Sequence, residues 1–441
     1  MIKTEKINTY QKALKFIHGR TKFKKIPTLS RMKLFLKLLG NPQNKISSIH
    51  VTGTNGKGSV VAFLTNLLSK DYKKVGSFTS PFLMYFNERI RINHQPISNF
   101  ELIKLVNIIR PIVAKLDEEL PTGGPTEFEI DTALMWVYFA RQKVDVAVIE
   151  VGLGGLLDST NIINPSVSII TTVGYDHMHL LGNTLSKIAY QKSGIIKDQI
   201  PVIVGRLPKE AFKVIQHKVL QTKSKFYYLG SQIKVSYFKS LGWKENFSFR
   251  FKDFNFSHLT ISLLGKYQIA NAALALTAYL IFLKQRNKGA DFKSIYQNLK
   301  CTKWPGRFEL MQKRPYIVLD GAHNEPAVLS LTKLIKSHFK NLKIFLLYSA
   351  LSDKKYQKML RIFQTIPNCQ IFLTYFKGPG KRQAFDPNKL AALVNDPRVL
   401  PFLDWQKAIK KIENKMRLQD ILVITGSLFF ISDVRHFILK I

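Results

Sequence analysis

A glycine-rich run at residues 52–59 contains the residue types that point most directly to chemistry. An apolar, strand-like segment (residues 48–52) precedes it, and a helix-like segment (residues 60–68) follows. Glycines let the backbone curl so that its N–H groups point at phosphate oxygens, and the helix N-terminus adds positive potential. Lys57 would supply a mobile positive charge, and Thr54 or Ser59 could reach a metal ion bound to the phosphates. The run therefore predicts a site for nucleotide phosphates.

The run departs from the common phosphate-loop pattern G-x-x-x-x-G-K-S/T at two positions. Val51 stands where the first glycine belongs, and Gly58 lies between Lys57 and Ser59. Two interpretations are open from the loop alone. It is either a glycine turn without a ligand or a distinct subclass of nucleotide-binding loop.

Polar residues follow three other strand-like runs in the first half of the chain. Glu150 lies at the end of residues 144–151, and a carboxylate beside a phosphate loop can bind Mg²⁺, although a strand-end glutamate can also pair with lysine. His177 follows residues 166–173 as a candidate metal ligand, general base or structural histidine. Ser80 follows residues 74–78 and is a phosphate-side hydroxyl or a turn residue. Lys192 precedes a Ser-Gly pair, where a surface lysine is the alternative.

A second group of candidates lies near residue 310. Arg307 follows a Pro-Gly pair and could reach a terminal phosphate, for which its planar guanidinium is suited. Asp320 ends an apolar run and could accept hydrogen bonds from ribose hydroxyls, and His323 follows it. Each of these motifs by itself is also compatible with an ordinary turn.

The elements that would position these residues alternate between strands and helices. Short β-branched runs at residues 48–52, 74–78, 144–151, 166–173 and 201–204 are separated by helix-like stretches at residues 60–68, 99–116 and 132–141. This order predicts a doubly wound parallel α/β sheet, in which ligands bind beyond the carboxyl ends of the strands. The candidate polar residues fall at those ends.

The second half of the chain predicts an addition and a further domain. Alternating segments at residues 247–251 and 259–263 indicate a small antiparallel sheet, and residues 267–283 an apolar helix. We expect a linker at residues 284–305. Strand–helix alternation then restarts at residues 316–319, 343–349, 370–375 and 421–425, which predicts a smaller Rossmann-like domain. The expected domains are residues 1–299 and 300–441.

Composition limits the class of protein. The 441 residues include 67 Lys and Arg against 29 Asp and Glu, a net charge of +38, and two cysteines. The basic residues are spread along the chain, which favours general surface charge and anionic small ligands over a nucleic-acid site. A charged N-terminal segment (residues 1–25), the cysteine count and the lack of an apolar run of roughly 18 to 20 residues predict a cytoplasmic protein without a membrane partner.

Taken together and in order, the motifs resemble those of the folylpolyglutamate synthase and dihydrofolate synthase family of the Mur ligase superfamily. The resemblance rests on residues 52–59, 150–155, 176–177, 192–194, 305–309 and 320–324, with Gln268 and Asn271, and extends from about Thr28 to residues 425–428. It implies a phosphate-loop ATPase domain followed by a smaller Rossmann-like glutamate ligase domain. It also implies ATP-dependent amide-bond formation: the γ-carboxylate of a folate becomes an acyl phosphate, which the α-amine of L-glutamate attacks.

The resemblance assigns roles to matching positions. ATP contacts are expected at Thr54, Asn55, Gly56, Lys57, Gly58, Ser59, Asn271, Arg307 and Asp320. Ser80, Glu150 and His177 match Mg²⁺ ligands, and Thr126, Glu127 and Phe128 match the wall beside the pterin. Lys192 matches a lysine that the superfamily carbamylates with CO₂; with Lys57 and His323 it makes up the expected catalytic set. A monovalent cation is a further candidate cofactor, and we expect a monomer whose partners are folate, L-glutamate and ATP.

Four positions depart from the family pattern. Leu156, Phe82 and Gln191 stand where many members have Arg, His and Glu, and Glu325 precedes Pro326 where Asn-Pro is common. These positions belong to the folate and glutamate side, so the retention of activity on dihydropteroate is left open.

Two rival functions would require features of their own in the sequence. A cell-wall Mur ligase usually has an extra N-terminal domain, for which a loop beginning near residue 53 leaves little room. A nucleic-acid-binding NTPase would need aromatic stacking platforms or a basic stripe.

Overall fold

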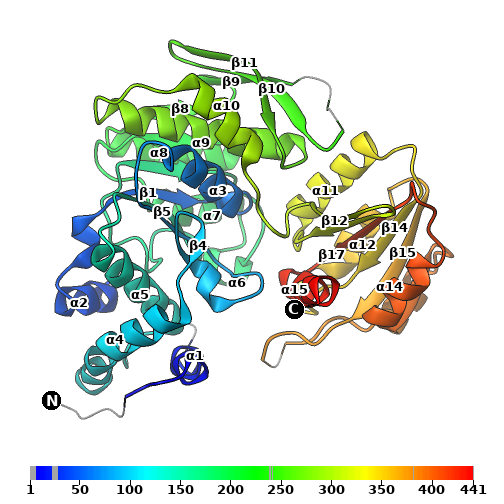
Figure 1. Cartoon of the computed structure of the whole chain (residues 1–441), viewed down its shortest axis with the longest axis horizontal. Helices are drawn as coiled ribbons and strands as arrows, with labels where there is room; N and C mark the ends of the chain where they lie inside the picture. Colours follow the sequence, from blue (N-terminus) through cyan, green and yellow to red (C-terminus); the bar gives the residue numbers. More distant parts are fainter. Residues whose placement is uncertain (1–5, 22–27, 238–239, 241, 381, 441) are drawn as a thin grey trace. The chain divides into compact units, whose positions relative to one another are not determined.

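The computed structural model describes residues 6–21, 28–237, 240, 242–380 and 382–440, drawn in sequence colours in Figure 1. The chain forms two compact units. The N-terminal unit contains residues 1–236, 248–259 and 270–301, and the C-terminal unit contains residues 237–247, 260–269 and 302–441. The expected functional division at residues 299–300 stays a prediction.

The N-terminal unit contains an eight-stranded sheet in the order β4-β3-β2-β5-β1-β6-β7-β8. Its strands are β1 (Ser47–Thr52), β2 (Val75–Phe78), β3 (Ile90–Ile92), β4 (Gln95–Pro96), β5 (Val146–Glu150), β6 (Val167–Ile170), β7 (Val202–Val204) and β8 (Phe226–Tyr228). Neighbouring strands in the series β2, β5, β1, β6, β7 and β8 pair in parallel. Strands β3 and β4 add an antiparallel edge beside β2. Buried residues on both faces of the central strands are typical of such sheets. The predicted parallel α/β sheet is confirmed.

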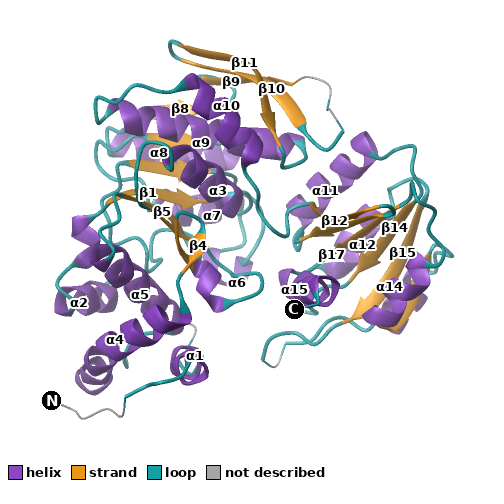
Figure 2. Ribbon diagram, viewed as in Figure 1, coloured by secondary structure: helices purple, strands orange, loops and turns teal. Residues whose placement is uncertain are grey.

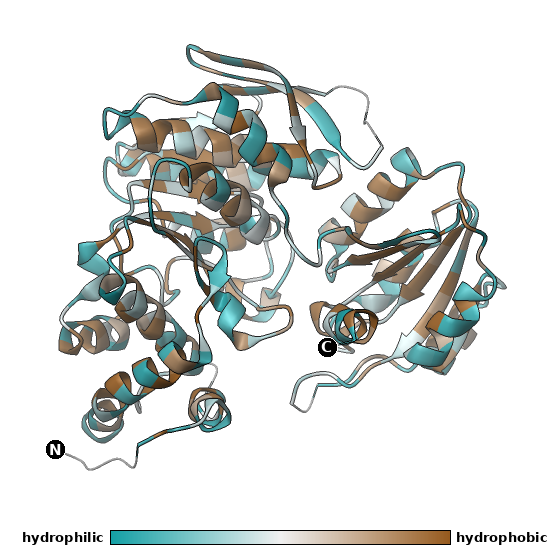
Figure 3. Cartoon of the chain, viewed as in Figure 1, coloured by the Kyte–Doolittle hydropathy of each residue, from teal (hydrophilic) through white to brown (hydrophobic). Residues whose placement is uncertain are grey.

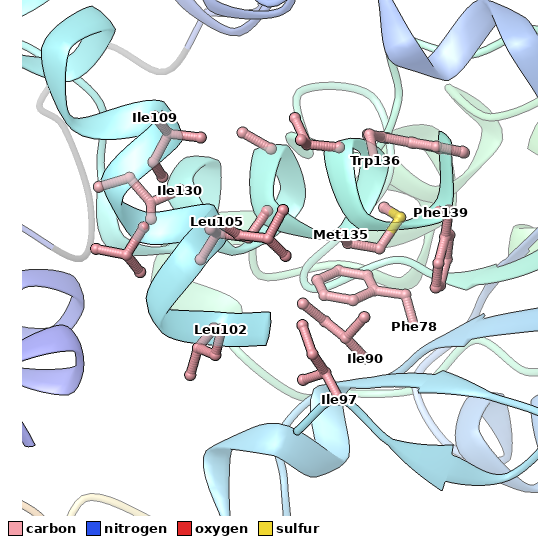
Figure 4. Close-up of a cluster of buried hydrophobic side chains, with 14 of the residues drawn as sticks. Phe78, Ile90, Ile97, Leu102, Leu105, Ile109, Ile130, Met135, Trp136 and Phe139 are labelled. Carbon is pink, nitrogen blue, oxygen red and sulfur yellow. The ribbon is translucent and has the colours of Figure 1, made fainter. Parts of the chain in front are cut away.

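Helices pack around this sheet (Figure 2). They are α1 (Tyr10–His18), α2 (Ser30–Leu38), α3 (Lys57–Leu68), α4 (Asn99–Glu119), α5 (Glu127–Arg141), α6 (Met178–Leu181), α7 (Leu185–Ser193), α8 (Lys209–Gln221), α9 (Lys266–Lys284) and α10 (Phe292–Cys301), with short 3₁₀ helices η1 (Pro42–Lys45) and η2 (Phe86–Arg89). In Figure 4, Leu105 of α4 and Ile130 and Trp136 of α5 belong to one buried apolar cluster with Phe78 and Ile90 of the sheet.

Two helices correct the sequence predictions. The expected linker at residues 284–305 contains α10, because its apolar residues Ile295 and Leu299 are four positions apart and both are buried. The expectation that no apolar run reaches the length of a membrane span is wrong for α9, which has 19 residues and a mean hydropathy of 1.2. However, 83% of that stretch is buried inside the fold, as in the core helices of globular domains that pass the same test.

The predicted addition is a three-stranded sheet in the order β11-β10-β9. Its strands are β9 (Ile233–Tyr237), β10 (Glu245–Phe251) and β11 (Phe254–Ile261). Buried and exposed residues alternate along β10, so its phenylalanines at 247, 249 and 251 share one covered face.

The C-terminal unit contains a six-stranded sheet in the order β12-β13-β17-β14-β15-β16. Its strands are β12 (Glu309–Lys313), β13 (Tyr316–Asp320), β14 (Ile344–Tyr348), β15 (Cys369–Tyr375), β16 (Val399–Asp404) and β17 (Ile421–Thr425), all parallel except β12. Its helices are α11 (Glu325–His338), α12 (Tyr356–Phe363), α13 (Pro387–Val394), α14 (Trp405–Glu413) and α15 (Leu428–Leu439). In Figure 3 the strands of this sheet are mostly brown (hydrophobic), whereas its helices show both brown and teal residues, so the strands are more apolar than the helices. The second, smaller α/β domain is confirmed.

Trp243 explains why the segment before β10 packs with the C-terminal unit. Its ring centroid lies 5.1 Å from that of Tyr316, 5.4 Å from that of Phe339 and 6.1 Å from that of Phe308. This aromatic cluster is built from residues far apart in sequence, and it fixes residues 243–245 beside β13 and α11.

Candidate active site

The glycine-rich run forms the turn between β1 and α3. Gly56 precedes the first residue of α3 with a φ of 89°, a left-handed conformation that favours glycine. A Cβ atom at this position would lie 2.5 Å from Oδ1 of Asn271, so the α9 side chain lies directly against the loop. Glycine has no side chain to cap the helix, and the first N–H groups of α3 are therefore suited to phosphate oxygens.

The loop is anchored to the residues that follow β6. The amide of Thr54 donates to the Thr172 carbonyl at 2.9 Å, and the Thr171 hydroxyl donates to the Asn55 carbonyl at 2.6 Å. The Thr54 hydroxyl accepts from the amide of Gly174 at 3.0 Å and lies 3.1 Å from that residue's carbonyl oxygen. Thr54 therefore anchors the loop to the segment that follows β6.

Lys57, Glu150 and Ser80 meet at the carboxyl end of β5. The Lys57 ammonium donates to the Gly53 carbonyl at 3.1 Å, and its Nζ lies 3.9 Å from Oε1 of Glu150. The other oxygen of Glu150 accepts from the amide of Ser80 at 3.2 Å. Glu150 is only 4% exposed. A buried carboxylate beside a lysine and a phosphate loop is suited to hold a cation between itself and a bound phosphate.

Lys192 is buried near the end of α7. Burial lowers the pKa of its amine to about 7, and the positive charge of Lys57 acts in the same direction. The carboxylates of Asp176 and Asp158 oppose this shift. A lysine with this pKa is largely uncharged just above neutral pH, and an uncharged amine is a nucleophile.

The backbone around Lys192 is packed against the Gly-Gly turn after β5. The amide of Leu156 donates to the Gln191 carbonyl at 2.7 Å. A Cβ atom on Gly155 would lie 2.8 Å from that same carbonyl oxygen, so only glycine fits there without a shift. The turn thus helps to fix the main-chain position of Lys192 near the end of α7.

His177 lies at the start of α6 with a φ of 48°. Its backbone amide donates to Oδ1 of Asp176 at 2.9 Å, and its ring Nε2 is 3.9 Å from that oxygen. Its side chain is 43% exposed. Over the described residues, no group of three or more His, Cys, Asp and Glu side chains is placed to hold a metal ion. A metal at Glu150 would therefore need further ligands, such as phosphate oxygens.

The three residues expected beside the pterin begin α5. The Thr126 hydroxyl accepts from the amide of Glu129 at 3.3 Å, and the Glu129 carboxylate accepts from the amide of Thr126, which caps the helix. Oε1 of Glu127 is 2.9 Å from Nδ1 of His18. The Phe128 ring lies 5.8 Å from that of Phe78. Each residue thus also has a contact that orders the fold.

Arg307, Asp320 and His323 come together in the C-terminal unit. The Asp320 carboxylate accepts from the amides of Phe308 and Ala322, both at 2.9 Å, which ties two turns to the end of β13. Burial raises the pKa of Asp320, and the charge of Arg307 opposes that shift. Nδ1 of His323 is 2.8 Å from the Gly321 carbonyl oxygen.

Comparisons with known proteins decide the family. The Mur ligase middle domain matches residues 51–279, and the Mur ligase glutamate ligase domain matches residues 306–428. The chain is 41% identical to the dihydrofolate synthase/folylpolyglutamate synthase of Bacillus subtilis (strain 168), with 97% of this chain and 98% of that protein covered. The chain belongs to the folylpolyglutamate synthase family of Mur ligases.

A further relative and a solved structure agree with this family. The folylpolyglutamate synthase of Lacticaseibacillus casei is 37% identical over 98% of this chain and 99% of its own. A solved structure described as an FPGS-AMPPCP-folate complex has a TM-score of 0.86 at 36% identity, covering 98% of this chain and 100% of that one. The expected family, fold and enzyme class, an ATP-dependent ligase, are confirmed, and these matches favour the folate branch over a cell-wall ligase.

Sequence reasoning missed several residues that lie around the candidate site. Asp158 and Asp176 influence the pKa of Lys192. Asp176 belongs to the motif at residues 176–177, where its acidic side chain was the available signal, whereas Asp158 lies three residues after the motif at residues 150–155. His18, which contacts Glu127, and the ion pair of Arg89 with Asp131 come from three separate segments, and no local pattern links them.

Proposed function

We propose that the chain catalyses ATP-dependent addition of L-glutamate to the γ-carboxylate of folates and folate polyglutamates. The observation that carries this proposal is the buried Lys192 amine within the electrostatic reach of Lys57, in a site where Lys57 also contacts Glu150 beside a phosphate loop. The identity of the acceptor is supported by the names of the relatives.

The reaction would take place in two steps. The acceptor carboxylate attacks the γ-phosphorus of ATP, ADP leaves, and an acyl phosphate forms. The α-amine of glutamate then attacks the acyl carbon, phosphate leaves with the C–O bonding electrons, and the amine loses a proton. Lys57 and the N–H groups at residues 56–59 would stabilise negative charge on the transferred phosphoryl group. The other proposed ATP contacts are Thr54, Asn55, Asn271, Arg307 and Asp320.

The donor set beside the phosphate loop fits a hard divalent cation. Glu150 supplies a buried carboxylate, and Ser80 and His177 are the further proposed protein ligands. Mg²⁺ bound there would neutralise charge on the phosphate oxygens. A monovalent cation stays an expectation from the family resemblance, with no residue assigned to it.

Lys192 is proposed to form a carbamate. Its uncharged amine would attack CO₂, a C–N bond would form, and one proton would be released. The product carries a negative charge where the uncharged amine carried none. Burial and the lowered pKa of about 7 support this step, because both favour the uncharged amine.

Thr126, Glu127 and Phe128 are proposed to contact the acceptor, and His323 is proposed to act beside the nucleotide. The full chain, acting as a monomer in the cytoplasm without nucleic acid or membrane, is the proposed working form. Size-exclusion chromatography with light scattering would test the monomer.

A panel of acceptors tests the proposed reaction. Purified protein would receive ATP, Mg²⁺ and labelled L-glutamate with dihydropteroate, dihydrofolate, tetrahydrofolate or tetrahydrofolate diglutamate. We expect label in the products of the tetrahydrofolate forms, with ADP and phosphate released one for each amide bond. Product from dihydropteroate would show that dihydrofolate synthase activity is retained. Absence of product from every folate would refute the proposed function.

A further inference from the structure

A carboxyl group without a hydrogen-bond donor is buried in the middle of the N-terminal unit. Asp131 lies on α5, one turn after Glu127, and is 1% exposed. Neither of its carboxylate oxygens has a hydrogen-bond partner among the described residues. Its ion-pair partner is Arg89, whose Nε is 3.5 Å from Oδ2. Buried polar groups are rarely left this way, so the arrangement calls for a specific role.

Arg89 ends a loop that also carries Ser80, and we name residues 79–89 the Ser80 loop. The amide of Thr79 donates to the Arg89 carbonyl at 3.0 Å, which closes the loop at its base. Inside it, Glu88 accepts from the amides of Leu83 at 3.0 Å and Met84 at 3.3 Å. The loop is therefore closed at its base and held together internally by Glu88.

The Ser80 loop is tied to the rest of the unit at two places with different chemistry. At one end the amide of Ser80 donates to Glu150 beside the phosphate loop. At the other end the Arg89 guanidinium pairs with Asp131 and lies over the rings of Phe82 at 5.1 Å and Phe86 at 5.8 Å. The charge of Asp131 thus acts on the same segment that contacts Glu150.

We propose that Asp131 is a positioning residue whose ionised carboxylate holds Arg89, and through Arg89 the Ser80 loop, in the arrangement that places Ser80 against Glu150. Its link to catalysis rests on the proposed function, whereas its effect on the loop does not. Asp131 touches no reacting atom in this scheme and acts only through Arg89.

The attraction depends on the proton of Asp131. Burial raises the pKa of this carboxyl to about 7, and Arg89 opposes the shift. Two other charged groups influence it: Glu127 on the same helix raises the pKa, and His18 at the end of α1 lowers it. Protonation of Asp131 removes the charge that attracts the guanidinium. The loop should therefore be held more firmly above neutral pH than below it.

Hydrogen exchange of the full chain tests this inference without relying on activity. The amide exchange rate of a peptide covering residues 79–89 of the folded chain would be measured from pH 6 to 8.5. The exchange rate of the same sequence as an unstructured peptide, measured at each pH, would be divided by it to give a protection factor. We expect protection to increase several-fold across a transition near pH 7. Asp131→Asn keeps the shape but not the charge, and it should give protection that is low and independent of pH.

Two further variants, two checks of folding and one kinetic measurement make the result specific. His18→Gln should keep the transition, because it leaves Asp131 and Arg89 in place, whereas Arg89→Gln should abolish it. Circular dichroism and the thermal midpoint would check that each variant is folded. In Asp131→Asn, kcat/KM for the folate acceptor should fall about ten-fold at pH 8, with a smaller effect at pH 6, where the wild-type carboxyl is protonated.

Two outcomes would overturn the inference. One is an unchanged exchange transition in folded Asp131→Asn, and the other is its loss in His18→Gln but not in Asp131→Asn. If Asp131→Asn fails to fold, Arg89→Gln tests the same pair from the loop side. If no variant or wild-type protein ligates glutamate while the exchange transition follows Asp131, the proposed function fails and the positioning role stands.

Discussion

Nζ of Lys57 lies 3.9 Å from Oε1 of Glu150, on the edge where the carboxyl ends of β1 and β5 adjoin. At that distance the two charges attract, yet the atoms are too far apart for a good hydrogen bond. The lysine is therefore held near the phosphate loop without a short hydrogen bond to the carboxylate. A bound phosphate could then form an ion pair with the Lys57 ammonium, so that the Glu150 carboxylate could bind a cation.

Replacing Lys57 tests the phosphate loop. Lys57→Ala should reduce ATP-dependent ligation by about 100-fold or more, the usual cost of removing one preorganised stabilising group. Initial rates at saturating folate and glutamate would measure this. Lys70→Ala, an exposed lysine just after α3, is the matched control and should be close to wild type. Wild-type ligation by Lys57→Ala would mean that the loop assignment is wrong.

Replacing Lys192 tests the carbamate. Lys192→Ala should nearly abolish ligation, and added formate or acetate should partly restore it by supplying a carboxylate in the vacated space. Lys187→Ala, an exposed lysine on the same helix, should have little effect. Unchanged turnover in Lys192→Ala would exclude the carbamate role. An inactive variant that no carboxylate rescues would mean that Lys192 is essential for a reason other than a carbamate.

The pKa of Lys192 predicts how activity responds to CO₂. The lowered pKa of about 7 means that the amine is mostly protonated below this pH and cannot attack CO₂. In CO₂-depleted buffer, the restoration of activity by added bicarbonate should therefore be faster at pH 8 than at pH 6. Samples taken at intervals after bicarbonate is added would all be assayed at one pH. This separates the pH dependence of activation by CO₂ from the pH dependence of ligation. An activation rate independent of pH would contradict the prediction.

Gly56 predicts a local steric effect on nucleotide binding. Gly56→Ala places a side chain at a φ of 89° and within 2.5 Å of Asn271, so the loop must shift. We expect ATP binding, measured by calorimetry, to weaken by about 1–2 kcal/mol, the cost of left-handed backbone for an L-residue. Gly289→Ala meets nothing within 4 Å and should bind ATP normally. Equal affinities for the two variants would argue against the close approach.

Asp131 predicts a pH dependence of stability. Its folded pKa, raised from 3.8 to about 7, means that between these values the folded state keeps a proton that the unfolded state has lost. The contribution to stability is therefore fully present below about pH 4 and is lost as pH rises to about 7. Denaturant midpoints of wild type and Asp131→Asn should diverge over this range, with the wild type losing more stability. Parallel midpoints would show that the carboxyl is ionised throughout.

The sequence was sufficient for features that depend on local order. The strand–turn–helix at residues 48–68 and the strand ending at Glu150 could be predicted because apolar strands and the glycine turn are contiguous. The alternation of strands and helices likewise predicted both parallel sheets. Parallel pairing then brings successive strand ends to one edge, which is why residues as far apart as Gly53 and Glu150 could be assigned to one place.

Features built from distant segments could not be predicted. Asp131 and Arg89 are 42 residues apart, and each is unremarkable among its neighbours in sequence. Trp243 packs with Tyr316 and Phe339 although it lies before the expected linker. The helix α10 was missed because the polar residues of its outer face outweigh two buried ones. In each case packing, not local pattern, determines the result.

The hydrogen bond from the amide of Leu156 to the Gln191 carbonyl joins two of the positions that depart from the family pattern. It uses only main-chain atoms, so neither side chain is needed to make it. Both positions can therefore diverge during evolution without displacing the neighbouring Lys192. The side chains at these two positions can vary while the hydrogen bond that holds the main chain beside Lys192 stays in place.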